Sequence, residues 1–352
     1  MKKILLKKRE ISDNKPPLVV GEISANHSKS LNKILRMIDI AKDIGLEAIK
    51  IQTFKPEEMT FRLNKREFSI KQKFENKNWN NRSLFSIYKE AHLPFEWHEE
   101  IFKRANKIGI IAFSSVFDEI SLELLHKFNV PAFKIASLES QHYPLIEKVI
   151  KKNKPIIVST GTLSMDEIFE LDNFFKKKKF SKYALLHCIT QYPANYKNLN
   201  LKTILTLKKK LKTTIGFSDH TDDGSAAVAA VSLGANIIEK HFKETSKDKT
   251  LDSNFSLDPK AMKKLIVDCN NVWKSLGNSQ KKISSDEEKY KNYRRSIYAS
   301  KDIKIGDKIS LSNVKIIRPN KGLAPKLLKN IIGKKAKKNI RYATPITLKL
   351  FR

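Results

Sequence analysis

Eight short apolar segments recur along the first three quarters of the chain. They are rich in β-branched residues and lie at 18–20, 48–51, 110–113, 132–135, 156–158, 184–186, 214–217 and 235–238. Apolar runs without regular alternation are typical of strands that are buried on both faces, as in parallel sheets. The pattern therefore predicts eight buried parallel strands.

Helical patterns occupy the gaps between these segments. Leu31, Ile34, Leu35 and Ile38 have the spacing of one apolar helix face, and 143–150 fits a helix with proline in its first turn. Eight strands that alternate with helices over about 250 residues predict the α/β class and a (β/α)8 TIM barrel. A doubly wound open sheet is the alternative, but no Gly-x-Gly-x-x-Gly follows the first strand.

Two parts of the chain interrupt this rhythm. The stretch 55–93 is long for a strand-to-helix connection and carries several aromatic residues, which favours a lid or specificity loop; a disordered insertion is the alternative. Beyond the barrel, polar residues predict a linker, and short β-type runs with turn signals predict a compact, mostly β domain. The predicted division is a barrel over 1–276, a linker over 277–291 and a second domain over 292–352.

Composition narrows the classes of partner. A formal net charge of +32 would suit a polyanion. However, the lysines are spread along the chain, their densest runs fall at predicted helix ends, and no nucleic-acid-binding motif occurs. Codon bias and solubility explain the charge better, so we expect no nucleic-acid partner.

The chain also lacks the marks of a membrane or secreted protein. No stretch approaches the roughly 20 consecutive apolar residues that span a bilayer, and the apolar part of the first eight residues is too short for a signal peptide. Cys188 and Cys269 have no paired spacing, so we expect neither a disulfide framework nor a cysteine-based zinc site. These features favour a cytoplasmic protein without membrane attachment.

The seventh and eighth predicted strands end in similar polar clusters, Ser218-Asp219-His220 and Glu239-Lys240-His241. A short Ala-rich helix between them would return the chain to the same end of the barrel, where functional groups gather. Imidazole is the commonest side-chain ligand of divalent transition metals. His220 and His241 are therefore candidate metal ligands, and two unrelated polar strand ends are the alternative.

Two lysines stand inside otherwise apolar strands, where an unpaired ammonium group is costly. Lys50 and Lys134 could form buried ion pairs with Glu22 or Glu139. Alternatively, they could join hydroxyl groups in a site for a small phosphorylated acid. The other polar side chains expected at this end are Ser115, Ser137, Ser159, Thr190, Tyr192 and Ser218.

Eight motifs in order give the chain a specific resemblance. They are GEISANH (from Gly21), KIQTF (from Lys50), KIAS-x-E (from Lys134), VSTG (from Val158), LHC-x-x-x-YP (from Leu186), GFSDHT (from Gly216), IIEKHF (from Ile237) and LDSNFSLDP (from Leu251). Together they resemble the family of sialic acid synthases. Residues 296–352, with IRPNKGLAPK from Ile317, resemble the antifreeze-like SAF domain of that family.

Within the family, the chain is most similar to the pseudaminic acid synthase branch. The aromatic insertion, LDSNFSLDP and IRPNKGLAPK carry this similarity. Leu93 and Phe95 depart from the branch's usual TPWEWH, and Thr190 stands where sialic acid synthases have asparagine. N-acetylneuraminate or legionaminate synthase is the alternative inside the family. A different metal-dependent barrel aldolase or hydrolase, or a binding protein without activity, is the alternative outside it.

The resemblance implies condensation of phosphoenolpyruvate with an N-acyl amino sugar and water. In the pseudaminic acid branch the sugar is 2,4-diacetamido-2,4,6-trideoxy-β-L-altropyranose, and the products are pseudaminic acid and phosphate. His220 and His241 would hold Mn²⁺, Mg²⁺ or Co²⁺. The implied catalytic residues are Glu22, Glu139 and Lys50.

The resemblance also implies a set of substrate-binding residues. They are Lys134, Ser115, Ser137, Ser159, Thr190, Ser218, Tyr192, Asp252 and Arg318. The lysines and hydroxyl groups would bind phosphoenolpyruvate, while Tyr192 and Asp252 would orient sugar hydroxyls. Arg318 would reach the N-acyl group of the sugar in the neighbouring subunit's site, across a domain-swapped homodimer.

Overall fold

The computed structural model describes residues 3–71 and 78–351. The chain divides into two compact units, Met1–Gly277 and Asn278–Arg352, which are described separately. No helix within the described residues has both the length and the apolar character needed to cross a membrane.

The first unit is a closed barrel of eight parallel strands, so the predicted fold is confirmed. The strands are β3 (Leu18–Glu22), β4 (Ala48–Thr53), β7 (Ile111–Val116), β8 (Phe133–Ile135), β9 (Ile156–Ser159), β10 (Tyr183–Cys188), β11 (Thr214–Asp219) and β12 (Ile237–His241). They pair in chain order, and β12 closes the barrel on β3, with His241 beside Glu22. Each predicted apolar segment lies in or beside one of these strands.

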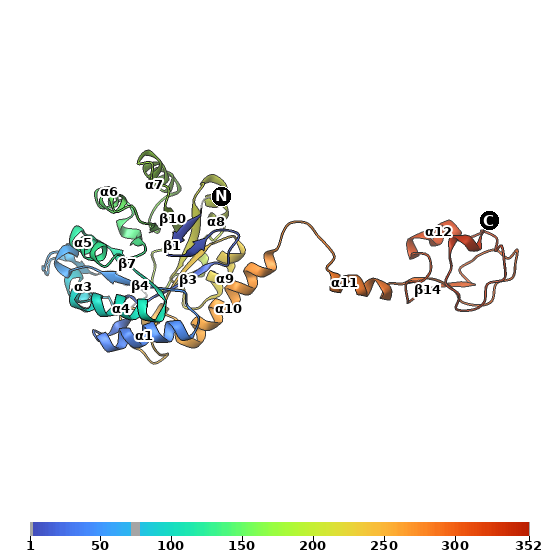
Figure 1. The fold of residues 1–352 in the computed structure, drawn as a ribbon, viewed down its shortest axis with the longest axis horizontal. Helices are drawn as coiled ribbons and strands as arrows, with labels where there is room; N and C mark the ends of the chain where they lie inside the picture. The colour runs from blue at the N-terminus through green and yellow to red at the C-terminus, as the bar shows by residue number, and fades with distance from the viewer. Residues whose placement is uncertain (1–2, 72–77, 352) are drawn as a thin grey trace. The chain divides into compact units, whose positions relative to one another are not determined.

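Eight helices follow the barrel strands and lie outside them (Figure 1). They are α1 (Leu31–Asp43), α4 (His98–Ile108), α5 (Glu119–Lys127), α6 (Tyr143–Lys151), α7 (Met165–Lys177), α8 (Thr203–Lys210), α9 (Ser225–Ser232) and α10 (Pro259–Leu276). Side chains cap several of them; Ser164, for example, forms a capping box with Glu167 at the start of α7. The apolar faces of the helices pack on the strands in one continuous core.

A separate apolar cluster closes the end of the barrel where the strands begin. The hairpin of β1 (Ile4–Leu6) and β2 (Arg9–Ile11) places Ile4, Leu6 and Ile11 against residues at the strand starts, such as Leu18 and Ala48. The sequence analysis did not predict this hairpin. The hairpin covers this end with apolar side chains, and the polar strand ends lie at the opposite end, which we call the barrel mouth.

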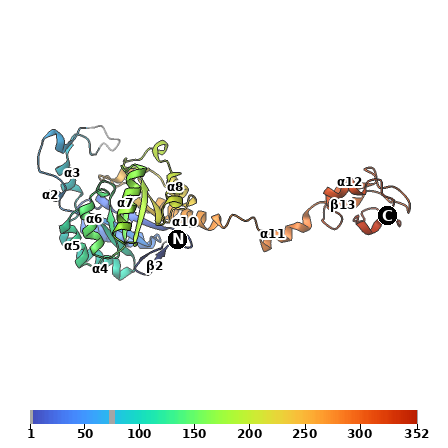
Figure 2. The ribbon, with the colours of Figure 1, turned by 90° about the horizontal axis from the view of Figure 1, so that it is seen from above.

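The predicted insertion at 55–93 contains α2 (Pro56–Met59), the short pair β5 (Ser69–Ile70) and β6 (Arg82–Ser83), and α3 (Leu84–Ala91). Residues 72–77 of this prediction lie outside the described residues. Ile70, Trp79 and Ile87 pack with Ala25 and Leu251, which follow β3 and β12. The insertion is thus anchored beside the barrel mouth, and Figure 2 shows α2 and α3 at the edge of the barrel unit.

The second unit is small and contains little regular structure. It has α11 (Ser285–Lys289), the antiparallel pair β13 (Ser296–Ala299) and β14 (Val314–Ile317), and α12 (Leu328–Ile331). Isolated bridges such as Ile303–Ile340 extend the β structure around a core that includes Ile297, Ile331 and Ile346. The predicted linker at 277–291 is not wholly irregular, because α11 forms within it.

Candidate active site

The strand register brings the charged residues of the mouth side by side. Glu22 of β3 pairs with Lys50 of β4, and Ser115 of β7 pairs with Lys134 of β8. On β12, the other neighbour of β3, Glu239 pairs with Ser218 of β11. Because parallel strands end at the same edge, residues far apart in the sequence form one polar layer there.

Lys50 is buried in the centre of this layer. Its Nζ lies 2.6 Å from Glu22 Oε2 and 3.7 Å from Glu239 Oε1, and it donates a hydrogen bond of 3.0 Å to Ser115 Oγ. Gln52 donates to the other oxygen of Glu22 at 3.0 Å. The ion pair between Lys50 and Glu22, one of the two alternatives from the sequence, is therefore present, and hydroxyl groups lie beside it.

Lys134 is also buried and has a different carboxylate partner from the one named by sequence reasoning. Its Nζ donates to Ser159 Oγ at 2.6 Å and to the Ile135 carbonyl oxygen at 3.1 Å. The carboxylate in its ion pair belongs to Glu239, at 3.9 Å, while Glu139 acts on Lys134 only at longer range. Lys134 thus has a carboxylate partner only at the longer distance of 3.9 Å and a hydroxyl group at 2.6 Å.

Glu239 links the two lysines and was missing from the predicted site residues. Its Oε1 faces both ammonium groups and accepts a hydrogen bond of 3.3 Å from Ser218. It lies two residues before His241 on β12, so both side chains leave the same face of the strand. That spacing was the sequence signal that identifies Glu239 as a site residue.

Burial raises the pKa of two of these carboxyl groups, whereas for Glu239 burial is outweighed by the charges of Lys134 and Lys50, which leave its pKa lowered. Burial raises the pKa of Glu22 to about 6 against the opposing charge of Lys50, and the pKa of Glu139 to about 7 against the charge of Lys134. Burial lowers the pKa of Lys134, opposed by Glu239. Burial also tends to lower the pKa of Lys50, but the charges of Glu22 and Glu239 outweigh it, so the pKa of Lys50 is raised. Lys50 is therefore a permanent cation, whereas Glu139 can exchange a proton near neutral pH.

Ser137, Gly161 and Thr190 form a second hydroxyl-rich part of the mouth. The Gly161 N–H donates to Ser137 Oγ at 3.1 Å. A Cβ at Gly161 would lie 2.1 Å from Thr190 Oγ1 and 2.7 Å from Ser137 Oγ, so only glycine fits between them. Thr190 Oγ1 is buried without a hydrogen-bond partner among the described residues.

The two candidate metal ligands lie next to each other, with ring centroids 5.5 Å apart. His220 Nδ1 donates to the Ile189 carbonyl oxygen at 3.0 Å, and its ring lies 4.3 Å from that of Tyr192. His241 Nδ1 has no hydrogen-bond partner among the described residues, and the nearest carboxylate oxygen, Asp252 Oδ2, is 3.8 Å away. The structure therefore brings together the two histidines, Tyr192 and Asp252.

These two histidines fit a divalent ion as a partial ligand set. The bond from Nδ1 of His220 to a carbonyl oxygen fixes its tautomer and leaves Nε2 with a lone pair for a ligand, while His241 has an unpaired buried nitrogen. No group of three or more His, Cys, Asp or Glu with metal-ligand geometry occurs within the described part of the chain. The protein would thus supply two imidazoles and leave the other positions to water and substrate.

Buried side-chain atoms that lack a hydrogen-bond partner mark this end of the barrel. Within residues 3–71 and 78–351 they are Trp79 Nε1, Thr190 Oγ1, Glu239 Oε2, His241 Nδ1 and Glu22 Oε2, the last held by its ion pair to Lys50. Buried polar atoms are rarely left unpaired in folded proteins. Their concentration here indicates a place that binds a polar ligand.

Two aromatic side chains link the insertion to the mouth. The rings of Trp79 and Tyr192 have centroids 5.2 Å apart. Asp252 Oδ2 accepts a hydrogen bond of 3.3 Å from the Ala25 N–H, next to the apolar cluster that holds the insertion. The insertion therefore contacts Tyr192, one of the two residues expected to orient the sugar.

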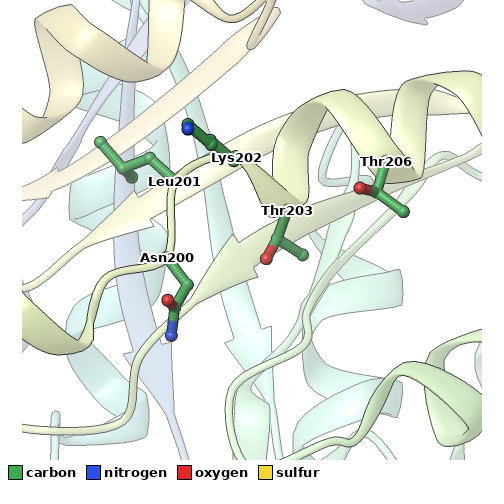
Figure 3. A pocket seen from close by; sticks show the side chains of 5 residues that line it. All are labelled: Asn200, Leu201, Lys202, Thr203 and Thr206. Carbon is green, nitrogen blue, oxygen red and sulfur yellow. The ribbon is translucent and has the colours of Figure 1, made fainter.

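Arg318 is exposed and directly follows β14 in the second unit, so its role in the site stays a prediction. An open surface pocket lies at the start of α8 (Figure 3), lined by Asn200, Leu201, Lys202, Thr203 and Thr206. None of the predicted site residues lines it, and we assign it no role.

Comparisons with known proteins agree with this arrangement. The NeuB family model matches residues 37–281, and the SAF domain model matches residues 294–352. A pseudaminic acid synthase of Campylobacter jejuni is 40% identical over 331 residues, which cover 94% of this chain and 95% of that protein. An N,N'-diacetyllegionaminic acid synthase of the same species is 35% identical and covers 93% and 98%. The crystal structure of an N-acetylneuraminic acid synthetase from Leptospira borgpetersenii has a TM-score of 0.72 and 32% identity, over 82% of this chain and 94% of that one.

Proposed function

Since the chain belongs to the NeuB family, we propose that it is a pseudaminic acid synthase. In the proposed reaction, phosphoenolpyruvate condenses with 2,4-diacetamido-2,4,6-trideoxy-β-L-altropyranose and water to give pseudaminic acid and phosphate. A relative with that name matches nearly the whole chain at 40% identity. The observation that carries the reaction class is the pair of buried lysines, Lys50 and Lys134, at the same barrel mouth as His220 and His241.

Phosphoenolpyruvate suits the lysine side of the mouth. The ammonium groups of Lys50 and Lys134 are held by carboxylates and by Ser115 and Ser159, and they can form charge-assisted hydrogen bonds to phosphate and carboxylate oxygens. The hydroxyl groups of Ser137, Ser218 and Thr190 can add neutral donors. Burial strengthens each of these contacts because water is excluded.

The sugar suits the histidine side of the mouth. A divalent ion bound by His220 and His241 would supply Lewis-acid polarisation of the open-chain sugar's aldehyde oxygen. Tyr192 and Asp252 lie beside these histidines and are placed to orient sugar hydroxyls. Trp79 adds an aromatic surface against Tyr192.

The carboxylates between the two halves are placed to manage charge and protons. Carbon 3 of phosphoenolpyruvate forms a bond to the aldehyde carbon, whose oxygen takes up a proton, and carbon 2 gains cationic character. Water adds to carbon 2 and loses a proton, and the tetrahedral intermediate then releases phosphate by C–O cleavage. We assign stabilisation of the cation to Glu22 beside Lys50, and proton transfer to Glu139, whose raised pKa lies near the working pH.

We further propose a domain-swapped homodimer in which Arg318 contacts the N-acyl group of the sugar in the partner's site. The domain division at 1–276, 277–291 and 292–352 belongs to the same proposal. Its support is the SAF match at residues 294–352 and the exposed position of Arg318.

We place the protein in the cytoplasm because both cysteines are free thiols, as in a reducing compartment.

The test is a direct comparison of substrates with the purified full-length protein, phosphoenolpyruvate and Mn²⁺. The proposed altrose derivative, N-acetylmannosamine and the precursor of legionaminic acid are each assayed by phosphate release and by the mass of the α-keto acid product. We expect the altrose derivative to react fastest. A preference for one of the other two sugars would assign the chain to the corresponding branch. Legionaminic acid synthase is the second candidate, because a relative with that activity in its name is 35% identical.

C–O cleavage can be checked in the same assay. Phosphoenolpyruvate that carries heavy oxygen in its bridging position should transfer that label to the released phosphate. Label retained in the sugar acid would contradict the proposed mechanism. Release of phosphate from phosphoenolpyruvate at the same rate with and without sugar would contradict the synthase reaction altogether.

A further inference from the structure

Asp219 and Lys240 form an ion pair with no exposed side-chain surface on either residue. They are direct partners across β11 and β12, with Lys240 Nζ 3.1 Å from Asp219 Oδ2. Each is followed in the sequence by one of the two histidines. Each member of the pair is thus the sequence neighbour of one candidate metal ligand.

The pair lies on the other side of the strands from the site. Successive side chains of a strand point to opposite faces, and Ser218 and Glu239, the residues before the pair, meet each other in the barrel mouth at 3.3 Å. Asp219 and Lys240 therefore point away from the mouth. They do not belong to the residues that we place against substrate.

Thr221 extends the ion pair into a closed network around His220. Its N–H and hydroxyl group donate to Asp219 Oδ1 at 2.9 and 2.8 Å. Its carbonyl oxygen accepts a hydrogen bond of 2.5 Å from Lys240 Nζ. The backbone on both sides of His220 is thereby tied to the residue that precedes His241.

A fully buried ion pair is weak evidence for stability, because apolar residues of the same volume are often as stable. Its geometric role is therefore the more informative one. We propose that Asp219 and Lys240 are a positioning pair that fixes His220 and His241 at the separation needed to bind one divalent ion. This inference rests on the proposed metal site and adds residues that do not touch the metal or the substrate.

Mn²⁺ titration of the metal-free, full-length protein by calorimetry tests the proposal. The double variant Asp219→Asn/Lys240→Met removes both charges and leaves no unpaired buried charge. We expect it to fold and to bind Mn²⁺ about 10- to 100-fold more weakly, the range for loss of residues that support metal ligands. Its affinity for phosphoenolpyruvate without metal should stay within about twofold of the original value, because the lysine side of the mouth is unchanged.

A matched control lies at the opposite end of β12. Lys208 forms an ion pair with Asp13 and donates to the Gly234 carbonyl oxygen at 2.7 Å, just before the strand begins. Asp13→Asn/Lys208→Met therefore removes an ion pair beside the start of β12 without touching the histidines. We expect a lower melting temperature and unchanged Mn²⁺ affinity for this control.

The outcomes separate the inference from the proposed function. A folded Asp219→Asn/Lys240→Met protein that binds Mn²⁺ like the unmodified protein overturns the positioning role and leaves the metal site intact. Absence of a Mn²⁺ site that depends on His220 and His241 overturns both. If the double variant does not fold, Asp219→Asn decides, since it keeps the shape of the side chain and removes the charge that pairs with Lys240; Mn²⁺ affinity equal to that of the unmodified protein then overturns the proposal.

Discussion

Lys50 and Glu22 face each other across the register of β3 and β4, with Nζ and Oε2 2.6 Å apart and both side chains almost completely buried. Glu22 is the last residue of β3 and Lys50 lies within β4, and each carries a charge that is costly to bury alone. A phosphorylated ligand that enters the mouth meets an ammonium group that is already desolvated and oriented. In the proposed reaction the pair would therefore contribute both to the fold and to ligand binding.

Removing one partner should separate these two roles. Lys50→Met leaves Glu22 buried without its cation, so we expect the free energy of unfolding to fall by about 3–5 kcal/mol. We also expect kcat/KM for phosphoenolpyruvate to fall about 10- to 100-fold, as for loss of a charge-assisted hydrogen bond. Chemical denaturation and steady-state kinetics measure the two effects.

The matched control is Glu22→Gln/Lys50→Met, which removes both charges. We expect it to regain most of the lost stability and none of the lost activity. If the double variant is as unstable as Lys50→Met, the loss comes from packing rather than from the unpaired carboxylate.

Glu139 should impose a pH dependence on both stability and rate. Its pKa is raised by burial from 4.5 to about 7, so the folded protein holds more protons than the unfolded chain between these values. The free energy of unfolding therefore falls as pH rises from about 4.5 to about 7. In Glu139→Gln this dependence should weaken, and the pH–rate profile should lose a limb near pH 7. Thermal unfolding and kcat/KM across this range measure both; identical profiles for the two proteins would exclude Glu139 as the titrating group.

The histidine pair predicts dependence on a divalent ion. Excess chelator should abolish turnover, and Mn²⁺, Co²⁺ or Mg²⁺ should restore it. His220→Ala and His241→Ala should lose activity and Mn²⁺ binding while they keep the melting temperature within a few degrees, since neither ring belongs to the apolar core. The exposed His126 provides the control variant His126→Ala, which should behave like the unmodified protein. Full turnover in excess chelator, with no bound metal, would contradict the assignment.

The barrel was predictable because its strands are buried on both faces, which leaves continuous apolar runs in the sequence. The N-terminal hairpin was not predictable in this way. Among the described residues of the hairpin, Ile4, Leu6 and Ile11 pack against the barrel, and a few apolar residues among lysines do not distinguish a strand that covers a barrel end from a surface strand. The role of the hairpin depends on its packing against the strand starts, which the local sequence pattern does not reveal.

The candidate site divides in a similar way. The strand-end rule predicted the lysines, the hydroxyl groups and both histidines that the structure brings to one end of the barrel. The order of the motifs predicted the family that the NeuB match confirms. The strand-end rule also placed Glu239 in the polar cluster at the end of the eighth strand, but no role was predicted for this residue, although it shares its strand face with His241. The rule also named Glu139 as a possible partner of Lys134, whereas the carboxylate in the ion pair belongs to Glu239. This partner could not be predicted, because it depends on the arrangement of strands that lie far apart in the sequence.

The proposed dimer can be tested by complementation. If Arg318 acts in the partner's site, Arg318→Ala and His220→Ala subunits should each be inactive alone, while a mixed dimer should contain one intact site. Activity should therefore reappear on mixing and refolding, up to about a quarter of the unmodified level for random pairing in which half the dimers are mixed. Deletion of 291–352 should also cripple sugar use. A monomer in solution that keeps normal activity after the deletion would rule out the swap.

The insertion should determine which sugar is accepted. Trp79 lies against Tyr192 and is anchored through the cluster with Ala25 and Leu251, so its ring borders the histidine side of the mouth. The proposed sugar has a methyl group at C6 and an amide at C4, which suit an aromatic surface better than a series of hydroxyl groups do. We therefore expect the altrose derivative to exceed N-acetylmannosamine by at least about a hundredfold in kcat/KM.

Trp79→Ala should reduce this preference about 10- to 200-fold, the range for loss of one apolar contact. The change should appear in the KM of the sugar, while the KM of phosphoenolpyruvate stays the same, because the lysines lie on the other side of the mouth. Phe61, an exposed aromatic residue of the same insertion, provides the control Phe61→Ala, which should leave the preference unchanged. Equal effects of the two substitutions, or no effect of Trp79→Ala, would show that the insertion does not read the sugar through this ring, while the barrel, metal and phosphoenolpyruvate assignments would stand.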